Sequence, residues 1–168
     1  MGEITQETIN TLIELFKKTV GEKGVKLLSN RVSKDLSGRE LVYEIASVAM
    51  EIYGTKGSYA VMRQLGRELA KSLMEKYPKE MWQSVLESAL NHFGFAEKIE
   101  YGEKEAYIVS CVFYEILQNK GLNPIEHAVC WTGWGFIEGF VREMKGVKGI
   151  KWESRDIEVE KCKFVFIK

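Results

Sequence analysis

The spacing of hydrophobic residues changes once along this chain, and the change predicts its fold class. Up to about residue 93, apolar residues recur near the 3.6-residue period of a helix, as at Ile9, Leu12 and Phe16. From about residue 95, short runs rich in strand-forming residues flank turns such as Gly102-Glu103. Helices first and strands later predict an α+β fold with an antiparallel sheet.

The same patterns predict the order of the elements. Helices are expected over residues 6–20, 25–35, 41–53, 59–77 and 79–93, and strands over 95–101, 105–113, 150–157 and 160–167. A helical turn is expected over 114–120, and a long helix from Asn123-Pro124 to about Met144, because Asn caps helices and Pro fits a first turn. We read residues 1–37 as an N-terminal helical segment. Residues 38–168 then form one compact domain, with the long helix buried on a small antiparallel sheet.

Composition narrows the classes of function. Lys plus Arg and Asp plus Glu each number 24, so the net charge is zero, which argues against nucleic acid as a partner. Charges or glycines break every apolar stretch well before 18 residues, so we expect no insertion into a membrane. The N-terminus has no basic-then-apolar signal, and we expect a cytoplasmic protein. Three cysteines, an odd number, do not indicate a disulfide framework.

The long helix expected over 124–144 has an unusual composition. It is apolar on nearly all sides, which predicts burial, and it contains three glycines, each of which costs about 1 kcal/mol in a helix interior. Such glycines indicate close approach by another backbone or by a ligand. The two interpretations are therefore tight packing against a helix or sheet, and an aromatic-walled cavity of roughly 300 Å³ or more. The candidate lining residues are His127, Trp131, Trp134, Phe136 and Phe140.

A second cluster consists of cysteines and acids in the last third of the chain. Thiolates and carboxylates are both zinc ligands, and a tetrahedral site needs four, which Cys130, Glu153, Asp156 and Cys162 could supply. The alternative is that the cysteines are small buried hydrophobes and that the acids face solvent. Cys111, in an apolar strand, is read as core. No catalytic triad, phosphate loop or dinucleotide fingerprint occurs, which favours a binding protein over an enzyme.

Several of these segments resemble one protein family. The run from His127 to Phe140, with Trp152-Glu153 and Cys162-Lys163-Phe164 after it, looks like the C-terminal half of the vinyl-4-reductase domain, and Leu65-Gly66-Arg67 resembles its helical part. Relatives of that family include hydrocarbon-binding proteins, sensor domains of phenol-responsive transcription activators and, more distantly, subunits of the transport-particle tethering complex. The resemblance implies an α+β fold, often dimeric, with an apolar ligand pocket between helices and sheet.

The resemblance also implies a metal site and a function. In the phenol sensors a zinc is held by positions that fall on Cys130, Glu153, Asp156 and Cys162, with Asp156 standing where the family has a cysteine. The function implied is a homodimeric sensor or carrier module for a hydrocarbon-like or aromatic molecule. One alternative is a non-catalytic scaffold like the tethering subunits. Another is an enzyme of tetrapyrrole or aromatic metabolism, which rests on the family name alone.

Overall fold

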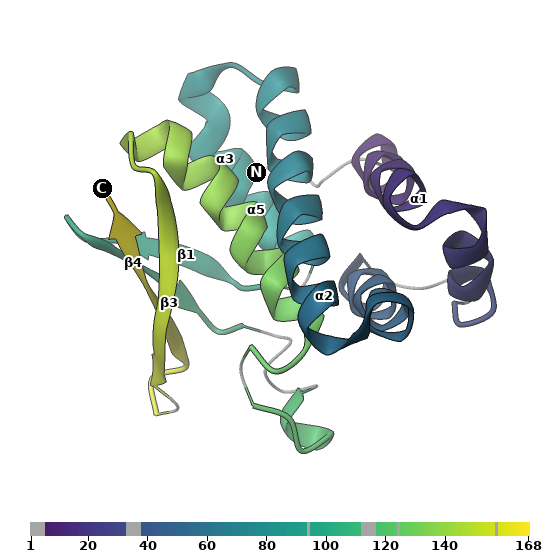
Figure 1. Ribbon diagram of the computed structural model, residues 1–168. Coiled ribbons are helices and arrows are strands. Elements are labelled where there is room, and N and C mark those ends of the chain that lie inside the picture. Colours follow the sequence, from purple (N-terminus) through teal and green to yellow (C-terminus); the bar gives the residue numbers. More distant parts are fainter. Residues whose placement is uncertain (1–5, 33–37, 94, 112–116, 124, 157) are drawn as a thin grey trace.

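The computed structural model describes residues 6–32, 38–93, 95–111, 117–123, 125–156 and 158–168 (Figure 1). The chain begins with helices and then alternates between strands and one further long helix. The elements are α1 (Gln6–Ser29), α2 (Gly38–Lys76), the 3₁₀ turn η1 (Lys79–Met81), α3 (Trp82–His92), β1 (Lys98–Tyr101), β2 (Glu105–Val109), α5 (Ala128–Lys145), β3 (Gly149–Asp156) and β4 (Lys161–Ile167). This order confirms the predicted α+β class.

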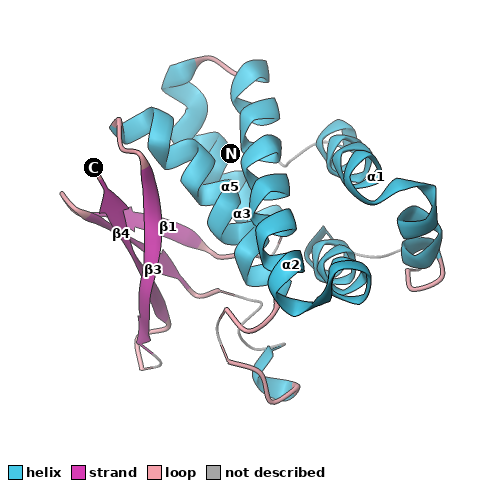
Figure 2. Cartoon of the chain, in the orientation of Figure 1, coloured by secondary structure: helices cyan, strands magenta, loops and turns pink. Residues whose placement is uncertain are grey.

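The four strands form one antiparallel sheet in the order β1-β2-β4-β3, so that two hairpins meet through β2 and β4 (Figure 2). Side chains alternate between its two faces. Along β4, Cys162, Phe164 and Phe166 are buried while Lys161 and Lys163 are partly exposed. The sheet therefore has an inner, apolar face and an outer, charged face.

Helix α5 lies between the inner face of the sheet and α2, and α1 packs on the side of α2 away from the sheet (Figure 1). The expected burial of α5 is confirmed, because most of its residues are buried. Phe136 and Phe140 are fully buried and pack against each other, and Phe93 of the segment after α3 meets Phe136 edge-on. These rings form the centre of the core.

Glycines allow α2 and α5 to approach closely. A Cβ atom on Gly135 would overlap the backbone of Arg63, and one on Gly66 would overlap the backbone of Thr132 and Phe136. A Cβ on Gly139 would lie 2.7 Å from that of Ala70. Of the two interpretations of the glycine-rich helix, tight helix packing is therefore the correct one for the face that carries Gly135 and Gly139.

Two predicted helix breaks prove to be kinks. Gly21 (φ 71°) and Gly54 (φ 75°) adopt left-handed backbone conformations inside α1 and α2, a conformation that costs glycine little. Each break is confined to one residue, so the helices expected over 6–20 and 25–35 are joined in α1, and those over 41–53 and 59–77 are joined in α2. Helix α1 ends at Ser29, earlier than expected, and residues 33–35 of that prediction lie outside the described residues.

The start of α5 also differs from the prediction. The helix begins at Ala128 with His127 as its N-cap, because Asn123 uses its backbone and side-chain N–H groups to bind the Glu126 carboxylate, both at 3.0 Å. Pro124 lies outside the described residues.

Strand β2 is shorter than the expected strand over 105–113. It ends at Val109, and the next residue, Ser110, has a positive φ of 53°. No helix in the described ranges is long and apolar enough to cross a membrane.

Candidate functional site

An apolar pocket of about 50 Å³ lies between the first half of α5 and the inner face of the sheet. Its walls come from segments far apart in sequence, because α5 packs against β3, and β4 and β2 follow β3 in the sheet. The lining residues are Phe95, Ile108, Cys111, Ile125, Val129, Cys130, Gly133, Trp134, Ile137, Trp152, Cys162 and Phe164. Four of these, Cys111, Ile125, Cys130 and Trp152, are only partly buried and lie where the pocket approaches the surface.

All three cysteines of the chain line this pocket: Cys111 after β2, Cys130 in α5 and Cys162 in β4. Burial, followed by the neighbouring Cys111, raises the pKa of the Cys130 thiol above its usual range. A neutral buried thiol behaves as a small hydrophobe with a weak S–H donor. The Arg155 guanidinium donates a hydrogen bond to Cys162 Sγ at 3.3 Å. The thiols therefore add little polarity to the wall of the pocket, which suits an apolar ligand.

Trp134 forms a fixed wall of the pocket. Its indole N–H donates to the backbone oxygen of Ile150 at 3.0 Å, and its ring stacks on that of Trp131 with centroids 4.5 Å apart. The Arg63 guanidinium lies over the ring at 4.4 Å, and Phe164 meets it edge-on at 5.9 Å. These four contacts hold the indole of Trp134 in one orientation.

Arg63 in turn is held by a buried carboxylate. Glu138 is 3% exposed and accepts from Arg63 at 3.2 and 2.7 Å, from Arg67 at 2.9 Å and from the Ile150 backbone N–H at 3.0 Å. Burial alone would raise the pKa of the Glu138 carboxyl, but these hydrogen bonds together lower it. The ionised carboxylate therefore joins α2, α5 and β3 beside the pocket.

His127 is buried at the start of α5 and has a structural role there. Its Nδ1 accepts from the Val129 backbone N–H at 3.1 Å, and its Nε2 lies 3.2 Å from Ser47 Oγ, which donates to the Tyr43 carbonyl. Tyr43 also stacks on the imidazole, with centroids 4.6 Å apart. Burial, with a smaller effect of Lys120, lowers the pKa of His127 to about 4. The imidazole is thus neutral at pH 7, with its proton on Nε2.

Only one of the five residues expected to bind a ligand lines this pocket. Of the five, Trp134 alone is among its lining in the part of the chain that the structure describes. Trp131 stacks on Tyr59 as well as on Trp134, and Phe136 and Phe140 are in the core. The expected volume of roughly 300 Å³ is wrong for this pocket, whose volume is about 50 Å³, because large core side chains fill the space beside α5.

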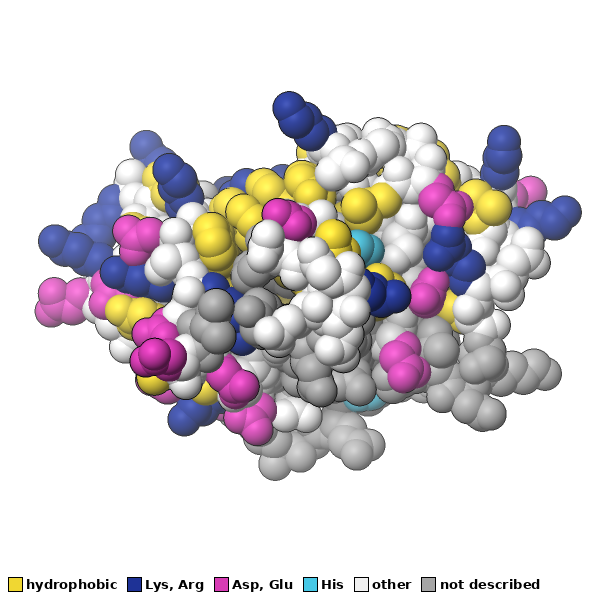
Figure 3. Space-filling model, turned by 90° about the horizontal axis from the view of Figure 1, so that it is seen from below, with side chains coloured by type: hydrophobic (Ala, Val, Ile, Leu, Met, Phe, Trp, Pro, Cys, Tyr) yellow, Lys and Arg dark blue, Asp and Glu magenta, His cyan; other side chains and the backbone are white. Residues whose placement is uncertain are grey.

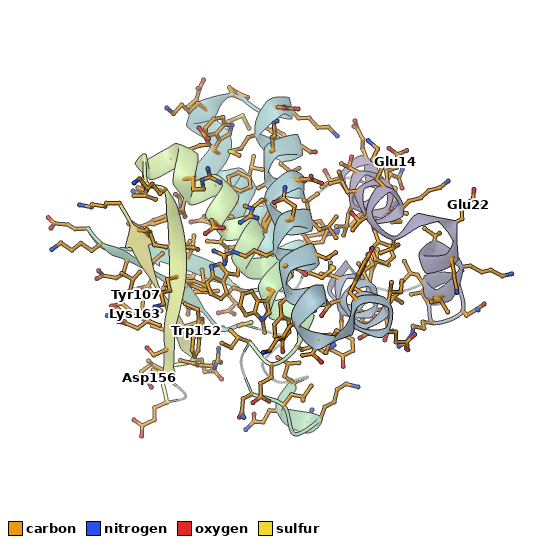
Figure 4. The ribbon with its side chains drawn as sticks, in the orientation of Figure 1. Glu14, Glu22, Tyr107, Trp152, Asp156 and Lys163 are labelled. Carbon is orange, nitrogen blue, oxygen red and sulfur yellow. The ribbon has the colours of Figure 1, made fainter. Side chains whose placement is uncertain are left out.

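Sequence reasoning named Trp134, Cys130 and Cys162 as site residues and missed the rest of the lining, of which Cys111 and Trp152 are two examples. Cys111 was read as core, and Trp152 appeared only as part of a family motif. The signal that could have found Trp152 is register, because it pairs with Phe164 across β3 and β4 and so shares the inner face. Figure 4 shows Trp152 toward the helices, whereas Tyr107 and Lys163 lie on the other face of the sheet.

The four predicted zinc ligands are not brought together. Glu153 pairs with Lys163 at 3.0 Å, and Asp156 accepts backbone N–H groups of the β3–β4 turn at 3.0 and 3.4 Å. Cys130 and Cys162 remain in the pocket. Within the described ranges, no three His, Cys, Asp or Glu side chains converge to hold a metal. The arrangement does not fit the zinc site that the resemblance implies.

A larger open groove of about 780 Å³ runs between α2, α3 and α5. Its lining mixes both signs of charge, and an apolar ligand is better matched by the smaller pocket. The groove is lined by Gln64, Arg67, Glu68, Lys71, Met74, Glu75, Trp82, Gly139, Arg142 and Glu143.

Comparison with solved structures shows which known fold this chain shares. Two solved structures of H-NOX domains, a mutant from T. tengcongensis and a Cs H-NOX mutant carrying 4-cyano-L-phenylalanine, each superpose with a TM-score of 0.53. Their sequence identities are 14% and 16%, over 98% of this chain and 98% and 97% of theirs. No family model matches the chain, and a search of curated proteins found no match. The chain therefore shares the fold of H-NOX domains.

Proposed function

We propose that the chain is a binding module for a small, uncharged, mainly apolar molecule, held between α5 and the inner face of the sheet. The observation that carries this proposal is the lining of the pocket. Apolar side chains and all three thiols, drawn from five separate segments, surround one volume of about 50 Å³. Such a volume has room for a few non-hydrogen atoms, since a cavity needs roughly 10–15 Å³ to hold one water.

Two resemblances support a sensor or carrier role. The H-NOX fold is that of a small-molecule sensor module, and the vinyl-4-reductase resemblance implies an apolar ligand pocket between helices and sheet. Because one fold can serve many functions, the proposal depends mainly on the lining of the pocket. The homodimer that the resemblance implies stays a prediction, which light scattering of the purified protein tests.

The face on which the pocket approaches the surface suits this role. Seen from the end at which α5 begins, hydrophobic side chains form a band across the middle of the molecule, with charged side chains on either side (Figure 3). The partly buried lining residues Ile125, Cys130 and Trp152 belong to segments at this end.

The test is titration of ¹⁵N-labelled protein with 2-methylpropene, followed through the backbone signals of Cys130 and Gly133. We expect saturable shifts in the wild type and weaker binding in Gly133→Ala, because the added methyl group points toward Phe95 and occupies part of a small pocket. Ser84→Ala, a change on the exposed surface of α3, is the matched control and should bind like the wild type. Absence of saturable shifts in the wild type would refute the proposal.

The small volume favours a second candidate, a scaffold whose interior is filled by its own side chains. Phe136 and Phe140 are fully buried and pack against each other in the core, and the pocket between α5 and the sheet is only about 50 Å³. In that case no probe binds, and the pocket is only a packing defect.

A further inference from the structure

Four tryptophans are present, and their indole N–H groups differ in one respect. Trp82 donates to the backbone oxygens of Met74 and Tyr77, Trp131 to Ile125 and Trp134 to Ile150, all at 2.9 to 3.2 Å. The indole nitrogen of Trp152 is buried and has no acceptor among the residues that the structure describes. A buried donor left without an acceptor costs about 1–3 kcal/mol, so its position requires an explanation.

Trp152 is a lining residue of the apolar pocket, and β3 holds it on the inner face opposite Phe164 (Figure 4). A β-bulge directly follows it, between Trp152 and Ser154. Bulges re-aim side chains and interrupt the regular pairing of a strand. The residue that carries the unpaired donor therefore belongs to the wall of the pocket.

Water is a poor partner for this donor. A bound water needs roughly 10–15 Å³ and about three hydrogen bonds, and the pocket meets the first requirement but not the second. Besides the indoles of Trp134, whose N–H is bonded to Ile150, and Trp152, its side chains are hydrocarbon groups and thiols, and the thiols are weak donors and weak acceptors. A molecule with one acceptor on an apolar body fits both features of the pocket.

We infer that the ligand class of this pocket is a small neutral molecule with one hydrogen-bond acceptor and no donor, such as a ketone, and that Trp152 Nε1–H donates to its oxygen. The inference rests on the proposed function, because it concerns the same pocket. An alcohol is disfavoured, since its O–H would find only thiol sulfurs. A carboxylate is disfavoured, since burial of an ion among apolar side chains costs more than one neutral donor returns.

Four probes of closely similar shape test the inference: acetone, 2-methylpropene, 2-propanol and acetate. Binding is followed by the indole ¹H–¹⁵N signals, of which the wild type has four, one for each tryptophan. The signal absent from Trp152→Phe identifies Trp152, and the three remaining signals verify that this variant folds. We expect acetone to bind about fivefold more tightly than 2-methylpropene, the effect of one neutral hydrogen bond, and to move the Trp152 proton downfield.

The variants separate the hydrogen bond from general packing. In Trp152→Phe the two probes should bind equally, while Trp82→Phe, which removes an indole bonded outside the pocket, should keep the fivefold preference. Equal binding of acetone and 2-methylpropene to the wild type would overturn the inference and leave the proposed function intact. Tighter binding of 2-propanol or acetate than of acetone would also overturn it. If none of the four binds, the proposed function itself fails.

Discussion

Arg63 and Glu138 are joined by two hydrogen bonds, of 3.2 and 2.7 Å, and the same guanidinium lies 4.4 Å above the ring of Trp134. The carboxylate is almost fully buried, whereas the arginine side chain is 26% exposed. One contact therefore fixes both the crossing of α2 over α5 and the orientation of a pocket wall.

Glu138→Gln should lower the free energy of unfolding by about 2 kcal/mol, measured by urea denaturation. Loss of one partner of a buried ion pair costs about 3–5 kcal/mol, and the partial exposure of both arginines reduces this. Glu153→Gln breaks the exposed pair with Lys163 and should cost less than about 0.5 kcal/mol. Equal effects of the two substitutions would contradict the structural role of Glu138.

His127 predicts a pH dependence of stability. Its pKa falls from 6.5 to about 4 on folding, so the unfolded chain binds the proton more tightly and stability is lost as pH falls below 6.5. Between pH 7.5 and pH 5 the loss from this residue should be about 2 kcal/mol. His127→Asn keeps an N-cap that does not titrate, and it should abolish most of this slope. An unchanged slope in the variant would mean that other groups cause it.

The glycines of α5 should respond oppositely to alanine. At Gly133 a Cβ would lie 3.4 Å from the Phe95 ring, an ordinary contact, so Gly133→Ala should raise stability by about 0.5–1 kcal/mol through helix propensity. At Gly135 it would overlap the Arg63 backbone, so Gly135→Ala should cost about 2 kcal/mol. Thermal and urea unfolding measure both, and a stabilising Gly135→Ala would contradict the close crossing of the helices.

Zinc should not contribute to stability. Glu153 and Asp156 are engaged by Lys163 and by the turn, so only Cys130 and Cys162 of the four predicted ligands lie together in the pocket. Protein purified without chelator or nickel resin should contain substoichiometric zinc, and a chelator should leave its unfolding temperature unchanged. One equivalent of zinc, lost together with stability on chelation, would show that the β3–β4 hairpin rearranges to bind it.

Periodicity predicted much of the fold because helices and strands leave different spacings of apolar residues. It placed α5 as a buried helix and its glycines as points of close approach, and Gly135 confirms this. It could not predict that Gly21 and Gly54 are kinks, since a left-handed glycine can end a helix or only bend it. The N-cap of α5 could not be predicted for a similar reason. His127, and not Asn123, caps the helix, and its imidazole is held there by tertiary contacts with Tyr43 and Ser47.

The candidate site was harder to predict than the fold. Trp134 could be inferred from helix composition, but Trp131, Phe136 and Phe140 lie on other sides of the same helix and face a stacking partner or the core. Which side faces the pocket depends on how α5 rotates against α2, and sequence spacing does not give that rotation. The meeting of three cysteines from β2, α5 and β4 depends on strand register, which also lies beyond local sequence.

The central claim is that the pocket between α5 and the sheet receives a small apolar ligand. A crystal structure of the protein under xenon pressure tests it most directly, since xenon enters dry apolar cavities. The account predicts a xenon atom in contact with Cys130, Gly133 and Trp134. A structure in which xenon binds elsewhere, or in which side chains of the core close this volume, would contradict it.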